Sequence, residues 1–192
     1  MRGLLSGFAA CGVLLLVACA TSATRPMQFV AEARKEASTA VAGNCAVYVR
    51  RVEDQRDSVE GFGSSPNLEL FARHIPDWVK SAVTSLDSAK GKIVALSDGS
   101  ERQDGLVVTV RIHKAYVHNM ATSRTAHVVL SNQYESGGRV LGTEVYRGSD
   151  TSVIWSNSAD EVEAAMNTAM NLALVAMGKD VDRYCKRLSS QN

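Results

Sequence analysis

Three consecutive segments in the middle of the chain alternate apolar and polar residues, and this alternation constrains the fold more than any other feature. The segments run over 106–117, 122–134 and 139–147, and their connections at 119–121 and 136–138 are short. Apolar residues at every second position lie on one face of a β-strand, and short connections between such strands are typical of hairpins. We therefore predict an antiparallel meander with one covered face and one more solvated face.

Two amphipathic helices are expected around this meander. One begins at Pro76, a residue type favoured in the first helical turn, and ends at Gly91. The second follows Ser158, which forms a capping box with Glu161, and its apolar stripe runs to about Cys185.

Short strands are predicted at 45–52 and 92–96, with an extended piece at 68–72 and a polar, mobile loop at 53–66. The predicted order is then strand, helix, strand, three-stranded meander and helix. This order indicates an α+β fold with a mostly antiparallel sheet and both helices on one face.

The first 18 residues have the features of an export signal. Arg2 supplies positive charge, residues 8–18 form an uncharged apolar run, and Leu-Val-Ala-Cys at 16–19 matches a lipobox. We predict cleavage before Cys19, whose thiol takes a diacylglycerol. Two alternatives remain, namely an ordinary signal peptide followed by a chance cysteine, and an uncleaved anchor, for which ~17 apolar residues are at the short limit.

The residue after the predicted cleavage site indicates the destination of the mature chain. Ala20 stands where an aspartate commonly retains a lipoprotein of Gram-negative bacteria at the inner membrane. We therefore expect the outer membrane, on its periplasmic face, and a loose helix at 28–42 in the segment that leads away from the lipid. The expected organisation is a signal peptide (1–18), a lipid-anchored tether (19–43), a single periplasmic domain (44–188) and a tail (189–192).

The four cysteines fit an oxidising compartment. Cys11 leaves with the signal and Cys19 is acylated, which leaves Cys45 and Cys185 as an even pair. A disulfide between them would close a loop of about 140 residues, worth up to ~5 kcal/mol if it acts through chain entropy. Two buried free thiols are the alternative.

The charge balance excludes one class of partner. The chain has 21 Lys and Arg against 20 Asp and Glu, and only Arg2 falls within the first 18 residues, so the mature chain has 20 of each. Nucleic-acid binding needs a basic surplus, and so does a polybasic membrane patch. We therefore expect no nucleic-acid partner, and attachment to the membrane through the N-terminal lipid.

Several of these features together resemble the YajG-like bacterial outer-membrane lipoproteins. The resemblance rests on the lipobox ending at Cys19, the strand that runs into Val-Glu-Asp-Gln-Arg at 52–56, the helix after Pro76 and the long helix after Ser158. It covers roughly 47–182. It implies a periplasm-facing interaction protein without a cofactor, and a fold similar to other small envelope lipoprotein domains.

Four residues are candidates for contact with a protein partner. Asp54 and Arg56 follow a strand end, where they could form a partner-facing charged turn or a local ion pair. Phe62 lies in the polar loop, within a Gly-Phe-Gly that lacks the rest of a phosphate-binding motif. Trp155 follows the meander and could be an exposed docking residue or could pack beneath the last helix.

No pattern in the sequence indicates catalysis or a metal centre. His113 and His127 could meet across a hairpin, but a zinc site needs three or four ligands. We therefore expect no metal and a non-enzymatic interaction or structural subunit of the cell envelope. Its oligomeric state is left open. A carrier or sensor of a small envelope ligand, such as a lipid or peptidoglycan fragment, is the first alternative, and a hydrolase is the second.

Overall fold

The structure is a computed structural model, and it describes residues 23–26, 45–57, 61–65, 68–72, 74–86, 93–96, 102 and 104–190. The predicted signal peptide, Cys19, the expected helix at 28–42 and Gly91 lie outside these residues. The expectations about cleavage and lipidation therefore stay predictions. Within the described part, no helix is long and apolar enough to cross a membrane.

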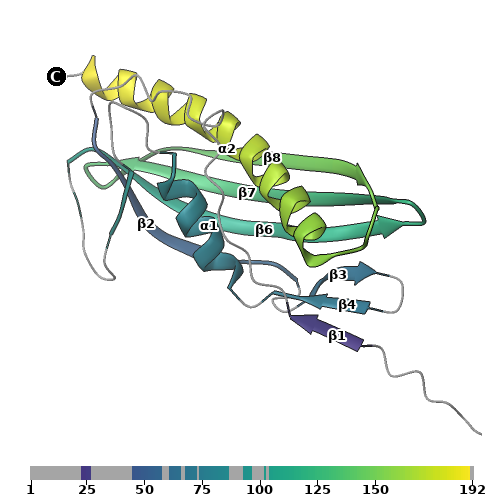
Figure 1. Cartoon of the computed structure of the whole chain (residues 1–192). Helices are drawn as coiled ribbons and strands as arrows, with labels where there is room; N and C mark the ends of the chain where they lie inside the picture. Colours follow the sequence, from purple (N-terminus) through teal and green to yellow (C-terminus); the bar gives the residue numbers. More distant parts are fainter. Residues whose placement is uncertain are drawn as a thin grey trace, which may run out of the picture.

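One eight-stranded sheet organises the molecule, with two helices against it (Figure 1). Strand β6 is central, because β7 pairs along one of its edges while β2 and β3 share the other. Strands β5 and β4 continue the sheet beyond β2 and β3, β1 pairs with β4, and β8 pairs with β7. The strands are β1 (Ala23–Pro26), β2 (Val47–Asp54), β3 (Gly61–Ser65), β4 (Leu68–Phe71), β5 (Ile93–Ala95), β6 (Leu106–Met120), β7 (Ser123–Ser136) and β8 (Arg139–Val153).

The predicted meander is present as β6, β7 and β8, which pair antiparallel along their lengths. The turn between β7 and β8 uses Gly137 and Gly138, whose positive φ angles of 56° and 75° suit a two-residue hairpin loop. Strand β8 is longer than predicted. Gly148, Ser149 and Asp150 break the alternation and indicate a turn, yet they pair with β7 because the neighbouring strand supplies the hydrogen bonds.

The expectation of a mostly antiparallel sheet is confirmed only in part, because the sheet is mixed. Strand β2 runs parallel to both β5 and β6, β3 runs parallel to β6, and β1 runs parallel to β4. Parallel neighbours need a long crossover between them, and here the chain leaves β2 and returns through β3, β4 and a helix. The alternation of side chains shows which residues share a face, but it is the same for both strand directions.

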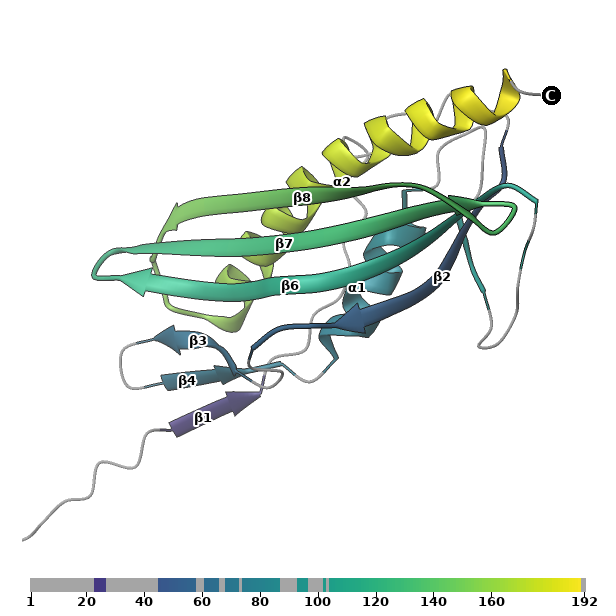
Figure 2. The ribbon, with the colours of Figure 1, turned by 180° about the vertical axis from the view of Figure 1, so that it is seen from behind.

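The two helices are α1 (Ile75–Thr84) and α2 (Ala159–Ser189), and both lie on one face of the sheet (Figures 1 and 2). The predicted N-cap is confirmed, since the Ser158 Oγ accepts a hydrogen bond from the Glu161 backbone N–H. The Glu161 carboxylate accepts from the Ser156 and Asn157 N–H groups. Helix α1 buries Trp78 and Val79 against the sheet. The two helices meet where the Trp78 Nε1 donates to the Asn167 Oδ1 at 3.1 Å.

A disulfide joins Cys45 to Cys185, with their Cα atoms 5.4 Å apart. Cys45 precedes β2 and Cys185 lies in the last turns of α2, so the bond ties the two ends of the main domain together. The pairing that the cysteine count predicted is therefore present, and Cys185 is fully buried in the core.

Two strands occupy segments where none was expected. Strand β3 forms within the predicted mobile loop, between β6 and β4. Strand β1 lies within 19–43, the stretch predicted as a tether, and joins the outer edge of β4. The extended piece predicted at 68–72 is β4.

Candidate functional site

Asp54 and Arg56 bind each other at the end of β2. The Arg56 Nε donates to the Asp54 Oδ1 at 2.8 Å and its Nη2 to the Oδ2 at 2.7 Å, and both side chains are largely buried. Burial raises the pKa of Asp54, but the hydrogen bonds and charge of Arg56 outweigh it and lower the pKa overall. The Gln55 N–H also donates to the Ile112 carbonyl. The pair therefore shapes the turn that follows β2.

Phe62 and Trp155 have opposite environments. Phe62 is fully buried in the core, so its side chain presents no surface to a partner. Trp155 is 86% exposed. It therefore does not pack beneath the last helix, which was one of the two alternatives. Trp155 lies in the loop that connects β8 to α2.

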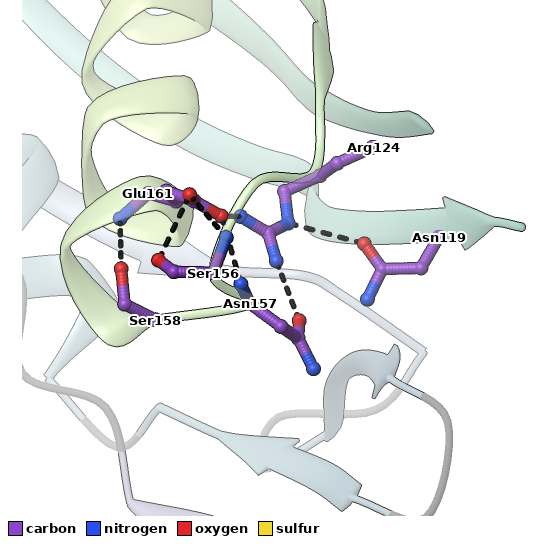
Figure 3. Close-up of polar contacts among 6 residues, drawn as sticks. All are labelled: Asn119, Arg124, Ser156, Asn157, Ser158 and Glu161. Carbon is purple, nitrogen blue, oxygen red and sulfur yellow. Dashed lines mark hydrogen bonds and ion pairs between the residues drawn. The ribbon is translucent and has the colours of Figure 1, made fainter. Parts of the chain in front are cut away.

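Glu161 holds the loop from inside the first turn of α2 (Figure 3). Its carboxylate accepts hydrogen bonds from the Ser156 N–H at 2.8 Å, the Ser156 hydroxyl at 3.0 Å and the Asn157 N–H at 3.1 Å. The bond from the Ser156 backbone contributes most to a lowered pKa of Glu161, and the charge of Arg124 adds to it. The two residues after Trp155 are thus fixed to the helix.

Arg124 ties the same loop to the sheet (Figure 3). Its guanidinium donates to the Asn119 Oδ1 at 3.1 Å and to the Asn157 Oδ1 at 2.8 Å, and it lies 3.4 Å from the Glu161 Oε2. The side chain is 1% exposed, and this burial lowers the pKa of Arg124, while Glu161 partly offsets the effect. One buried cation therefore joins the end of β6, the start of β7 and the loop before α2.

Sequence reasoning missed Arg124, although a signal was present. Arg124 is two residues before Ala126 and four before Val128, so it has the same parity as the apolar residues on the covered face of β7. A charged residue that alternates in step with buried apolar residues faces the core, and it needs a partner nearby. Here the partners come from 119, 157 and 161, which are close only in the folded chain.

Apolar side chains gather near the same end of the sheet. Met120, the last residue of β6, is 61% exposed, and Val153, the last residue of β8, is 54% exposed. Both are in register with Ser123 of β7, which lies between them. The Ile154 N–H donates to the Thr122 carbonyl at 2.9 Å, so the chain is still tied to the hairpin just before Trp155. We call Met120, Val153 and Trp155 the apolar tip.

A second polar cluster lies between α2 and the other half of the meander. The Tyr134 and Tyr146 hydroxyls are 2.8 Å apart, and the Tyr146 hydroxyl donates to the Asp180 Oδ2 at 3.0 Å. Burial raises the pKa of both tyrosines. The Tyr184 hydroxyl donates to the Glu144 Oε1 at 3.0 Å. These bonds join α2 to β7 and β8 and satisfy polar groups that the helix would otherwise bury.

The histidines of the open face do not converge. His113 lies beside Ser131, with 2.7 Å between the Nε2 and the Oγ, whereas His127 pairs in register with Tyr116. His113 and His127 therefore do not meet across the hairpin. Burial and the nearby positive groups lower the pKa of His127. In the described part of the chain, no three His, Cys, Asp or Glu side chains lie close enough together to hold a metal.

Comparisons with known proteins give a set of distant structural neighbours. A Xanthomonas campestris protein of the DUF330 family is 15% identical, with 88% of this chain and 99% of that chain covered and a TM-score of 0.48. A minor lipoprotein from Acinetobacter baumannii is 9% identical, with 76% and 93% covered and a TM-score of 0.41. A lipoprotein from Neisseria meningitidis is 9% identical, with 63% and 94% covered and a TM-score of 0.37.

No protein-family model and no curated protein matches the sequence. At identities and TM-scores this low, we take neither a family nor a function from the structural neighbours. The YajG-like resemblance therefore stays a prediction from the sequence.

Proposed function

We propose that the chain is a lipid-anchored protein on the periplasmic face of the outer membrane, where it acts as a non-enzymatic interaction subunit of the cell envelope. The lipobox at 16–19 and the disulfide between Cys45 and Cys185 support the compartment. The polar side chains that the fold brings together, such as Arg124, Glu161 and Tyr146, bind one another across elements. They stabilise the domain, which supports a docking role over chemistry.

The observation that carries the interaction role is the free edge of β8. Among the described strands, β8 has one neighbour, β7, and it extends over 15 residues without a proline. Natural edge strands are usually short or blocked, because an unpaired row of backbone N–H and C=O groups recruits another chain. Strand β8 also exposes Val140 and Val145. We infer that a protein partner pairs with this edge, as in other cases of strand addition.

Site-specific photocrosslinking in cells tests this proposal. A photoreactive residue is placed at Thr143, Arg147 or Thr151, which are exposed on β8, and matched controls carry it at Ala164 or Lys179, which are exposed on α2. We expect one discrete crosslinked species from the β8 positions and none from the α2 positions. Equal yields from both elements, or no product from β8, would contradict the proposal.

A further inference from the structure

The apolar tip and the N-terminal end of β1 lie at the same end of the molecule. Ala23 is in register with Leu68 of β4, Leu68 with Ser65 of β3, and the adjacent Ser64 with His118 near the end of β6. Three strand spacings of about 4.8 Å therefore separate Ala23 from the end of β6. In Figures 1 and 2 the start of β1 and the β6–β7 turn lie on the same side of the molecule.

The predicted lipid is close to this end by chain length alone. Ala23 is four positions after Cys19, and a fully extended chain covers at most about 3.5 Å per residue. Cys19 therefore lies within about 14 Å of the start of β1, whatever its conformation. A bilayer that holds the acyl chains of Cys19 must approach the domain from this end.

The turn and the loop at the tip are uncharged, and the exposed charge that follows them in the chain is Asp160, in the first turn of α2. Residues 119–123, which make the β6–β7 turn, and residues 151–159, which make the loop before α2, contain no charged side chain. Arg124 and Glu161 lie behind them, where each is already bound. Moving a charge out of water is costly, so the uncharged turn and loop suit the membrane interface, with Asp160 left in water.

The tip has the chemistry of an interfacial anchor. Trp155 is 86% exposed on a loop that Glu161 and Arg124 hold in place, so little loop entropy is lost on docking. Tryptophan is enriched at membrane–water interfaces, where the ring sits at the level of the headgroups. Met120 and Val153 add apolar surface beside the hairpin.

We propose that the apolar tip docks on the phospholipid bilayer to which Cys19 attaches the chain, with Trp155 in the interface. The inference rests on the proposed lipid anchor. It gives the domain two attachments at one end, one covalent and one by contact. The strands of the meander then run away from the membrane surface. The edge of β8 is accessible to a protein partner along its length.

Quenching of tryptophan fluorescence by brominated lipid tests this docking. The acylated full-length mature protein is reconstituted in vesicles of phosphatidylethanolamine and phosphatidylglycerol with brominated acyl chains. Trp78 is buried and Trp155 is exposed, so the Trp155→Phe variant reports the background from Trp78 alone. We expect brominated vesicles to quench the wild-type emission and to leave that of Trp155→Phe unchanged.

Two further variants localise the contact in the Trp155→Phe background. Met120→Trp restores a reporter at the tip, and Leu172→Trp places one at an exposed position of α2. We expect quenching from the first and none from the second. Equal quenching of both would indicate adsorption without a preferred face and would overturn the proposal.

The experiment separates failure of docking from failure of the anchor. Flotation of the vesicles and the intact mass of the protein report whether Cys19 carries its acyl chains. Protein that floats with the acyl mass present but shows no quenching of Trp155 overturns the docking inference alone. Protein without the acyl mass overturns the proposed anchor, and the docking inference falls with it.

Discussion

Arg124 is a charged side chain at a position where the pattern of β7 places apolar residues. Its burial is tolerated because three oxygen-bearing side chains surround it, from Asn119, Asn157 and Glu161. Buried charges need such partners, since an unpaired one costs several kcal/mol. The guanidinium and the Glu161 carboxylate together hold the loop that carries Trp155.

Replacing Arg124 should therefore destabilise the domain. In Arg124→Met the apolar chain length is kept, but the three acceptors lose the bonds from the guanidinium, and we expect the free energy of unfolding to fall by about 2–3 kcal/mol. Arg147→Met is the matched control, because Arg147 is exposed on β8, and it should change the value by less than ~0.5 kcal/mol. Urea denaturation of both variants is the measurement, and equal stabilities would refute the role given to Arg124.

Glu161 gives this network a pH dependence with a defined sign. Its pKa is below the ordinary value of 4.5, chiefly through the Ser156 backbone N–H. A carboxylate with a lowered folded pKa stabilises the fold above its unfolded pKa, and the contribution is lost as pH falls through the folded pKa. We expect stability to decline below about pH 4.5, the ordinary value, and Glu161→Gln to remove part of that decline.

Asp160→Asn serves as the control for this titration, because Asp160 lies in the same helical turn and is exposed. Stability measured by urea denaturation across the acid range should separate the two variants. If the free energy of unfolding of Glu161→Gln falls with decreasing pH as it does in the wild type, the hydrogen bonds to the loop do not depend on the charge of the carboxylate.

At the scale of elements, the packing of α2 on the meander depends on small residues at the contact. A Cβ added to Gly148 of β8 would overlap the Ala169 carbonyl of α2. The apolar stripe of the helix includes Ala165, Ala169 and Ala173, all buried. Small side chains on both surfaces let the helix approach the sheet closely, and overpacking such a contact is destabilising.

Gly148→Ala should consequently push α2 away from β8. We expect a loss of about 1–3 kcal/mol in the free energy of unfolding, measured by chemical denaturation. Ser149→Ala is the control, because Ser149 is next to Gly148 in β8 and its side chain is exposed. An unchanged or increased stability of Gly148→Ala would mean that the helix does not rest on this strand as described.

The disulfide fixes the far end of α2 to the start of β2. Because it closes a long loop, breaking it should lower the free energy of unfolding by about 2–4 kcal/mol. Urea denaturation with and without reductant measures this, and the double variant Cys45→Ala, Cys185→Ala should be insensitive to reductant. Equal stability of the oxidised and reduced wild type would argue against a structural role for the bond.

The sequence predicted those elements whose signal is local. The alternation of β6, β7 and β8, the N-cap at Ser158 and the even cysteine pair each need only nearby residues or a count. Strands β1 and β3 were not predicted, because both are short and each depends on a distant partner to join the sheet. Ala23 of β1 pairs with Leu68 and Gly63 of β3 pairs with Val117, although β3 also pairs with β4, which follows it directly. Trp155 was identified as a candidate, whereas Arg124 required the fold to bring its partners together.

At the scale of the whole molecule, the domain has two ends with different roles. One end carries the disulfide between Cys45 and Cys185, which closes the main domain. The other carries the apolar tip and the start of β1, and it is the end nearest to the predicted lipid. Strand β8 runs between the two ends, and among the described strands it pairs only with β7. The proposed function depends on this difference between the two ends, because the edge of β8 must remain accessible to a partner when the other end is anchored at the bilayer.

The mass of the mature N-terminus tests the central claim most directly. The protein is isolated from the membrane fraction of its host, digested, and its N-terminal peptide is measured by mass spectrometry. The account predicts a peptide that begins at Cys19 and carries a thioether-linked diacylglycerol together with an amide-linked acyl chain. An unacylated N-terminus, or a chain that retains residues 1–18, would contradict it.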